Sequence, residues 1–246
     1  MGRRAAVRIV AHRGASRYAP ENTLAAFDLA LQMGADSLEA DLRLTRDGMV
    51  VLLHDTHVDR TTSGSGPVHS LGRDEVRQLD AGRWFDRRFA GQGVPSLLDF
   101  LRRFGGRRVL ELELKTPAVV RPALSAVRAA RLQDSVMFTS FHFTTLQAVR
   151  LLDPAVRLGW LRSSVTPRAV AMLRALRGHS ICPSGSTVTP EQIRLCRSHG
   201  LEVRAWGIRD VRDMHHALSC GVDGMTIDFP DTLARALGRR QRSGSI

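Results

Sequence analysis

The chain has 246 residues and a formal net charge of +12, with 36 lysines and arginines against 24 acidic residues. This length suits one large α/β domain, and no run of residues approaches the roughly 20 apolar positions of a membrane-spanning helix. Three cysteines, Cys182, Cys196 and Cys220, lack metal-ligand spacing and are typical of reduced thiols. We therefore expect a cytoplasmic protein that makes no stable insertion into a membrane.

The positive charge does not by itself indicate a nucleic-acid partner. The arginines are spread over many segments, aromatic residues make up 5% of the chain, and there is no finger spacing or stacking motif. We expect no binding to nucleic acid. Lys115 is the only lysine, which indicates a position that needs a compact ammonium group and not a planar guanidinium.

Strand-like and helix-like segments alternate along the chain, which indicates a parallel sheet covered by helices. Asp47-Gly48 is a strong hairpin signal, so the strand after it is expected to run antiparallel to the strand before it. The other eight strands have the number and spacing of a TIM barrel. The predicted strands are 7–11, 37–44, 49–53, 108–114, 136–140, 156–161, 180–182, 202–206 and 224–227.

Helices are expected between the parallel strands. Asn22 or Thr23 can cap the first helix, which ends at Gly34. The stretch 56–94 breaks the alternation, and a long irregular segment in a compact domain is more often a lid or binding loop than a linker. The remaining helices are predicted to follow Ser96, Pro117, Thr144, Pro167, Pro190, Asp210 and Pro230.

One domain is expected to span residues 1–238, because no composition shift or internal repeat divides the chain. The tail 239–246 is expected to be disordered. The sequence carries no signal for an oligomeric state.

Acidic residues recur at every second position of two predicted strands. Glu39-x-Asp41 lies on one strand and Glu111-x-Glu113-x-Lys115 on another. Residues two apart in a strand point to the same face, so each set projects together. Carboxylates on an inner strand need a bound cation, a salt-bridge partner, or both. The two strands are therefore candidates for the floor of an active site.

Histidines lie near these acids. His12-Arg13-Gly14 closes the first strand, and pairing Leu44 with Met49 across the hairpin places Glu39 opposite His54. Each pattern alone has a simpler interpretation. Glu39 and Asp41 could lie on the wet face of an edge strand, and His54-Asp55 could lie in a solvated loop. Internal salt bridges are the interpretation that we favour for Glu111.

Taken in order, the motifs resemble the glycerophosphodiester phosphodiesterase family over about residues 9–230. Any one motif is weak, whereas the ordered set is highly specific. The motifs are Ala11-His-Arg-Gly14, Pro20-Glu-Asn-Thr23, Glu39-Ala-Asp41, Thr45-Arg-Asp-Gly48, His54-Asp55, Arg60-Thr-Thr62, Glu113-Leu-Lys115, Ser140-Phe141 and Gly221-Val-Asp-Gly224.

The resemblance implies a TIM barrel that uses a divalent cation, Ca²⁺ or Mg²⁺, to hydrolyse small glycerophosphodiesters to glycerol 3-phosphate and an alcohol. Carboxylate oxygens suit these hard ions. Histidines suit the proton steps near neutral pH. Carried over by position, the resemblance makes Glu39, Asp41 and Glu113 the metal ligands, His12 and His54 the acid and base, and Arg13 and Lys115 the phosphate contacts. Trp206 would pack against the substrate, although a core tryptophan is the competing interpretation.

The chain departs from the family pattern after Trp206. The family commonly continues with Thr-x-Asn-Asp, whereas this chain has Gly207-Ile208-Arg209-Asp210 and so places a cation where the family has small polar groups. The departure bears on substrate preference more than on the core chemistry. Asp228, which begins an Asp-x-Pro sequence after the last strand, is expected to be a turn or helix-start residue.

The segment 56–94 matches the insertion that covers the mouth of the barrel in the family, which favours compact, water-soluble diesters. Two alternatives remain for the site. One is a lysophospholipase D-like activity on the same barrel, which would need an apolar groove for an acyl chain. The other is a phosphate-binding module without catalysis, against which the intact acid, base and ligand positions argue.

Overall fold

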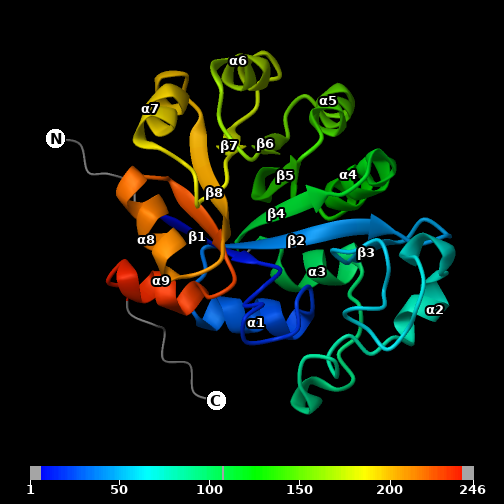
Figure 1. The fold of residues 1–246 in the computed structure, drawn as a ribbon. Coiled ribbons are helices and arrows are strands. Elements are labelled where there is room, and N and C mark those ends of the chain that lie inside the picture. The colour runs from blue at the N-terminus through cyan, green and yellow to red at the C-terminus, as the bar shows by residue number, and fades with distance from the viewer. Residues whose placement is uncertain (1–6, 107, 240–246) are drawn as a thin grey trace.

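The structure, a computed structural model, describes residues 7–106 and 108–239. Eight parallel strands form a closed barrel, because β1 pairs with both β2 and β9 (Figure 1). The predicted TIM-type barrel is therefore confirmed. Its strands are β1 (Arg8–His12), β2 (Ser37–Leu44), β4 (Val109–Leu114), β5 (Val136–Ser140), β6 (Arg157–Leu161), β7 (Ser180–Cys182), β8 (Glu202–Ile208) and β9 (Gly224–Ile227).

One further strand, β3 (Val50–Leu52), runs antiparallel beside β2, as predicted. The predicted register of this pair is wrong. Leu44 pairs with Val50, not with Met49, because Thr45 and Met49 close a three-residue loop in which Gly48 has φ +80°. This loop takes up one more residue than a two-residue turn. Glu39 therefore does not lie opposite His54 in the ladder, and His54 comes after the end of β3.

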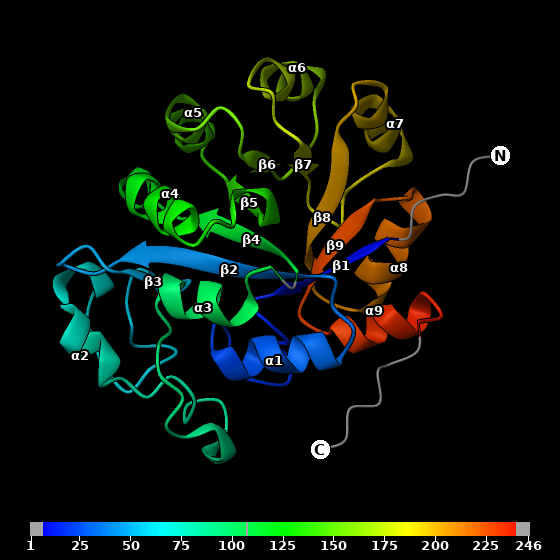
Figure 2. The same ribbon diagram turned by 180° about the vertical axis from the view of Figure 1, so that it is seen from behind.

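Helices cover the outside of the barrel, as the alternating pattern predicts. Figure 2 shows the ring from behind, with α1 and α9, from opposite ends of the chain, side by side. Thr23 caps the first helix and Asp210 caps α8. The outer helices are α1 (Leu24–Gln32), α3 (Leu97–Phe104), α4 (Val120–Ala129), α5 (Phe143–Leu152), α6 (Pro167–Ala175), α7 (Pro190–Ser198), α8 (Val211–Cys220) and α9 (Pro230–Ala236).

Two of these helices begin away from the predicted positions. Thr144 lies within the first turn of α5, because the His142 carbonyl already accepts a hydrogen bond from the amide of Thr145. A 3-10 turn over Pro117–Val119 precedes α4. At the other end of the chain, Arg239 forms an ion pair with Asp36 at 2.6 Å, whereas residues 240–246 of the predicted disordered tail lie outside the described part.

The segment between β3 and α3 contains the irregular stretch predicted over 56–94. It includes α2 (Arg73–Arg77) and the 3-10 turns Val68–Ser70 and Arg87–Phe89. Figure 1 shows this segment beside β3, at one side of the barrel. Together with β3 it forms a small separate apolar core of Val51, Leu53, Val58, Val68 and Val76.

The main apolar core lies between the strands and the outer helices. Phe27 of α1 packs on Phe100 of α3 with ring centroids 4.6 Å apart. The interior of the barrel differs, because it contains a fully buried ion pair. Arg204 of β8 places Nε 2.7 Å from Glu111 Oε2 of β4. Thus Glu111 forms the internal salt bridge that its sequence pattern favours, while no sequence signal singled out Arg204.

None of the helices in the described ranges has the length and apolar character needed to cross a bilayer.

Candidate active site

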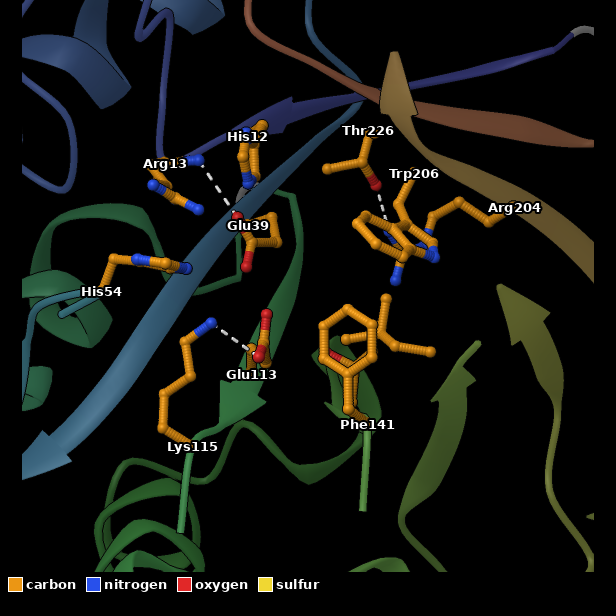
Figure 3. Close-up of a pocket in the computed structure, with 13 residues that line it drawn as sticks. His12, Arg13, Glu39, His54, Glu113, Lys115, Phe141, Arg204, Trp206 and Thr226 are labelled. Atoms are coloured by element: carbon orange, nitrogen blue, oxygen red, sulfur yellow. Dashed lines mark hydrogen bonds and ion pairs between the residues drawn. The ribbon is translucent and has the colours of Figure 1, made fainter. Parts of the chain in front are cut away.

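A cavity of about 200 Å³ opens among the carboxyl-terminal ends of the strands, where TIM barrels carry their active sites. Figure 3 shows the carboxylates with His12, Arg13, His54 and Lys115 toward one side of this cavity, and Phe141 and Trp206 with Arg204 toward the other. Almost all of the predicted site residues line the cavity, namely His12, Arg13, Glu39, His54, Glu113, Lys115 and Trp206. Asp41, the remaining one, is fully buried and bonded to two of the lining residues.

Three carboxylates from two adjacent strands meet beside the cavity. Each of Glu39, Asp41 and Glu113 offers one oxygen, and these oxygens lie within 4.8 Å of one another. Alternation within β2 brings Glu39 and Asp41 to one face, and the parallel register sets Asp41 beside Glu113 of β4. All three residues are buried. The three acids can therefore contact one ion.

Asp41 has the most contacts among the three acids. Lys115 Nζ lies 2.8 Å from Asp41 Oδ1 and 2.6 Å from Glu113 Oε1. Arg13 Nε lies 3.0 Å from Asp41 Oδ2, and the Asn22 amide donates to the same oxygen at 2.9 Å. Burial alone would raise the pKa of Asp41, but the charges of Lys115 and Arg13 hold it well below its usual range. Asp41 is therefore ionised at neutral pH.

Glu39 behaves differently from Asp41. Burial, followed by the negative charge of Asp41, raises the pKa of Glu39 to about 7. With all three carboxylates ionised, the cluster carries one more formal charge than Arg13 and Lys115 balance. A bound divalent cation relieves such an excess, and an all-oxygen donor set suits Ca²⁺ or Mg²⁺, so the residues present fit a hard metal ion.

A strained turn places the first histidine. His12 ends β1, and Arg13 and Gly14 after it have φ +55° and +86°, both in the left-handed region. A Cβ on Gly14 would lie 2.5 Å from the Ala26 carbonyl carbon, so only glycine fits against α1. At this turn the Arg13 amide donates to both the Glu39 carbonyl and Glu39 Oε2, at 3.0 Å each.

His12 has a carboxylate partner from the other end of the chain. Its Nδ1 lies 2.6 Å from Asp228 Oδ1, which also accepts from the Ser16 hydroxyl at 3.0 Å. Burial alone would lower the pKa of His12, but the hydrogen bond to Asp228 contributes to a net rise above the ordinary value. Asp228 is not the cap of α9, which is Phe229. The sequence predicted a turn or helix-start residue at Asp228 and did not predict its contact with His12.

His54 also bonds to a carboxylate, that of the next residue. Its Nδ1 lies 2.7 Å from Asp55 Oδ1. The pKa of Asp55 is lowered to about 2, first by its hydrogen bond from Arg60, so this carboxylate is ionised and can only accept. Nδ1 of His54 is therefore the donor, and Nε2 remains as the basic nitrogen. Burial lowers the pKa of His54 below its ordinary value, as do the charges of Lys115 and Arg13.

Comparison with known proteins identifies the chain's relatives. The model of the glycerophosphoryl diester phosphodiesterase family matches residues 12–232. The chain belongs to this family. A glycerophosphodiester phosphodiesterase of Caldanaerobacter subterraneus subsp. tengcongensis is 33% identical over 231 residues, which cover 92% of this chain and 95% of the relative. As a member of the family, the chain is a phosphoric diester hydrolase.

Solved structures agree with this assignment. A glycerophosphodiester phosphodiesterase of Agrobacterium tumefaciens is 35% identical and superposes with a TM-score of 0.83, covering 93% of this chain and 99% of the other. A phosphodiesterase of Oleispira antarctica in complex with the product sn-glycerol-3-phosphate is 28% identical, with a TM-score of 0.88 and coverage of 95% and 97%.

The side of the cavity away from the acidic cluster carries two aromatic rings in this family member. Phe141 and Trp206 meet edge to face, with centroids 4.9 Å apart. Trp206 Nε1 donates to the Arg162 carbonyl at 2.9 Å, which fixes the indole, and the ring still lines the cavity. Trp206 therefore forms part of the cavity wall, and its hydrogen bond to the Arg162 carbonyl holds it in place.

The departure from the glycerophosphodiester phosphodiesterase pattern after Trp206 has a structural outcome. Gly207 lines the cavity with φ +68°, and a Cβ there would meet no atom within 4 Å. Arg209 is 74% exposed and pairs with Asp213 at 3.1 Å, and it is not among the described residues that line the cavity. The change therefore adds open space beside Trp206 and places no arginine in the pocket wall.

Proposed function

We propose that the chain hydrolyses glycerophosphodiesters to glycerol 3-phosphate and an alcohol by histidine acid–base catalysis. One observation carries the proposal: the His12 and His54 imidazoles, the cations Arg13 and Lys115, and carboxylates of the acidic cluster line the same cavity. The product complex of the Oleispira relative supports the choice of product. We assign the activity to one domain over residues 1–238, because the family match runs from 12 to 232.

Glu39, Asp41 and Glu113 would hold one divalent ion, Ca²⁺ or Mg²⁺. When bound, such an ion supplies positive charge against the phosphate oxygens. Arg13 and Lys115 line the cavity and would contact the same phosphate through the donors that their carboxylate partners leave free. Their ion pairs hold both side chains in place before the substrate arrives.

The two histidines would divide the proton transfers according to their surroundings. His54, whose pKa is lowered and whose Nδ1 is occupied, is suited to accept a proton at Nε2 from the attacking hydroxyl. His12, whose pKa is raised, is suited to remain protonated and to donate to the leaving oxygen. The attacking hydroxyl would be the neighbouring one of the glycerol arm, giving a cyclic phosphate that water then opens.

Cavity size favours compact substrates. A volume of about 200 Å³ accommodates a small polar diester better than an acyl chain. We infer that the segment 56–94 covers the mouth when substrate is bound, since this segment leaves the barrel directly after His54. The lysophospholipase D-like alternative would need an apolar groove continuous with this cavity.

The substrate test compares two diesters that share the choline headgroup. Protein freed of metal by a chelator and then supplied with Ca²⁺ or Mg²⁺ is incubated with glycerophosphocholine or with lysophosphatidylcholine. The products are read by ³¹P NMR. We expect glycerol 3-phosphate from the first and negligible turnover of the second. We also expect each ion to raise the melting temperature, because only the folded protein assembles the acidic cluster.

Preference for lysophosphatidylcholine would support the lipid phosphodiesterase instead. Binding of glycerophosphocholine without product would support the phosphate-binding module. An unchanged melting temperature with either ion would contradict the metal site. The Glu113→Gln variant, which removes one carboxylate of the cluster, should lose the rise in melting temperature, whereas a nonspecific effect of added salt would persist in it.

The Asp228→Asn variant is expected to lose activity at alkaline pH. Asp228 helps to raise the pKa of His12, so the neutral amide should let His12 lose its proton at lower pH. The alkaline limb of kcat/KM should therefore move to lower pH. The acid limb, which His54 sets, should stay in place. The measurement is kcat/KM between about pH 5 and pH 9.

Ser16→Ala removes the other hydrogen-bond partner of Asp228 and should leave the profile nearly unchanged. If Asp228→Asn moves the acid limb instead, the assignment of acid and base is reversed.

A further inference from the structure

Arg60 connects two carboxylates near the cavity. It belongs to the Arg60-Thr-Thr62 motif, to which the proposed reaction gives no role. Its Nη1 and Nη2 donate to the two oxygens of Glu21 at 2.8 Å each, and its Nε donates to Asp55 Oδ2 at 2.5 Å. The two-pronged contact with Glu21 is the strongest geometry that arginine makes with a carboxylate.

Each of these carboxylates also bonds to a residue of the site. Glu21 Oε1 accepts from Arg13 Nη1 at 3.0 Å, and Asp55 Oδ1 accepts from His54 Nδ1 at 2.7 Å. Arg60 is thus linked through Asp55 to the imidazole of His54 and through Glu21 to the guanidinium of Arg13. Both of these groups line the cavity. Arg60 itself is not among the described residues of the cavity wall.

The chain of contacts restricts both site residues. Arg60 holds the Asp55 carboxylate where its Oδ1 accepts from His54 Nδ1, which keeps the ring hydrogen on Nδ1 and leaves Nε2 free. Glu21, held at both oxygens, has a fixed position from which to orient Arg13. The segment that follows β3 is thereby tied to the β1–α1 loop at the point where both approach the cavity.

We propose that Arg60 is a positioning residue that sets the tautomer of His54 and the direction of Arg13. The proposal rests on the function proposed for this site. Arg60 touches neither the cavity nor the acidic cluster, so its effect on turnover passes through Glu21 and Asp55. The Arg60 side chain is 46% exposed, so the fold should tolerate its replacement.

The test compares Arg60→Met and Arg60→Lys with Arg103→Met. Arg103 is a matched control, because it makes a two-pronged contact with Asp28 and is 52% exposed. We expect Arg60→Met to lower kcat for glycerophosphocholine by roughly 10-fold or more, as losses of supporting contacts do. Arg60→Lys should recover part of that loss, and Arg103→Met should keep the native rate. All three should melt close to the native temperature.

A second measurement does not depend on turnover. The ¹⁵N shifts of the His54 ring report its tautomer, and we expect hydrogen on Nδ1 in the native protein and a mixture in Arg60→Met. If Arg60→Met keeps the native kcat and the native ¹⁵N shifts of the His54 ring, the role of Arg60 is overturned. A native protein that hydrolyses no glycerophosphodiester would overturn the proposed function instead, and the ring spectra would then decide on Arg60 alone.

Discussion

The His54→Ala variant is expected to lower kcat by about 10²–10⁴-fold, the range for loss of a general base. The imidazole lines the cavity, Asp55 holds its Nδ1, and the basic Nε2 has no substitute in the truncated side chain. The side chain is 36% exposed, so the fold should tolerate its removal. His12→Ala should cause a loss of similar size through the missing acid. The measurement is steady-state hydrolysis of glycerophosphocholine together with a melting curve.

A change of leaving group separates the two roles. A diester of glycerol with p-nitrophenol needs little protonation of its leaving oxygen, so His12→Ala should recover most of its rate with this substrate. His54→Ala should remain slow. His57→Ala is the matched control, since His57 is exposed, lies three residues away and bonds to Thr56. Near-native rates for both histidine variants with both substrates would contradict the acid–base assignment.

The Arg204→Met variant is expected to lose about 3–5 kcal/mol of unfolding free energy. Arg204 and Glu111 are fully buried inside the barrel, and Arg204 also bonds to Thr226. Arg8 lies 3.5 Å from Glu111 and compensates only in part, so removal of Arg204 leaves a buried carboxylate without its main partner. Unfolding in urea, followed by circular dichroism, measures the loss.

The double variant Arg204→Met/Glu111→Leu should recover most of that stability. It removes both charges and keeps an apolar volume, a replacement that is often neutral or stabilising. Arg103→Met, at an exposed ion pair, should cost less than about 1 kcal/mol. If Arg204→Met has the same urea midpoint as the native protein, the buried ion pair does not stabilise the fold.

The barrel could be predicted because its signals are local. Alternating strands and helices, caps such as Thr23 and Asp210, and the Asp47-Gly48 turn each lie within a few residues. The hairpin register could not, since two-residue and three-residue loops share the Asp-Gly signal and differ by one position. The structure still brings His54 to the cavity, because the backbone after β3 turns toward it.

The acidic cluster could be predicted because alternation within a strand fixes which side chains share a face. Its supporting contacts could not. His12 and Asp228 are separated by 216 residues, and Arg60 and Glu21 by 39, so only the closed barrel brings them together. The buried position of Arg204 could not be predicted for another reason. The chain has many arginines, and nothing in the sequence distinguishes a buried one from the others.

The meeting of β1 and β9 has a consequence for biosynthesis. His12 precedes its partner Asp228 by 216 residues, and Asp228 follows β9, so the pair forms only after β9 has been synthesised. A nascent or prematurely terminated polypeptide that lacks β9 has an open ring and an unpartnered imidazole.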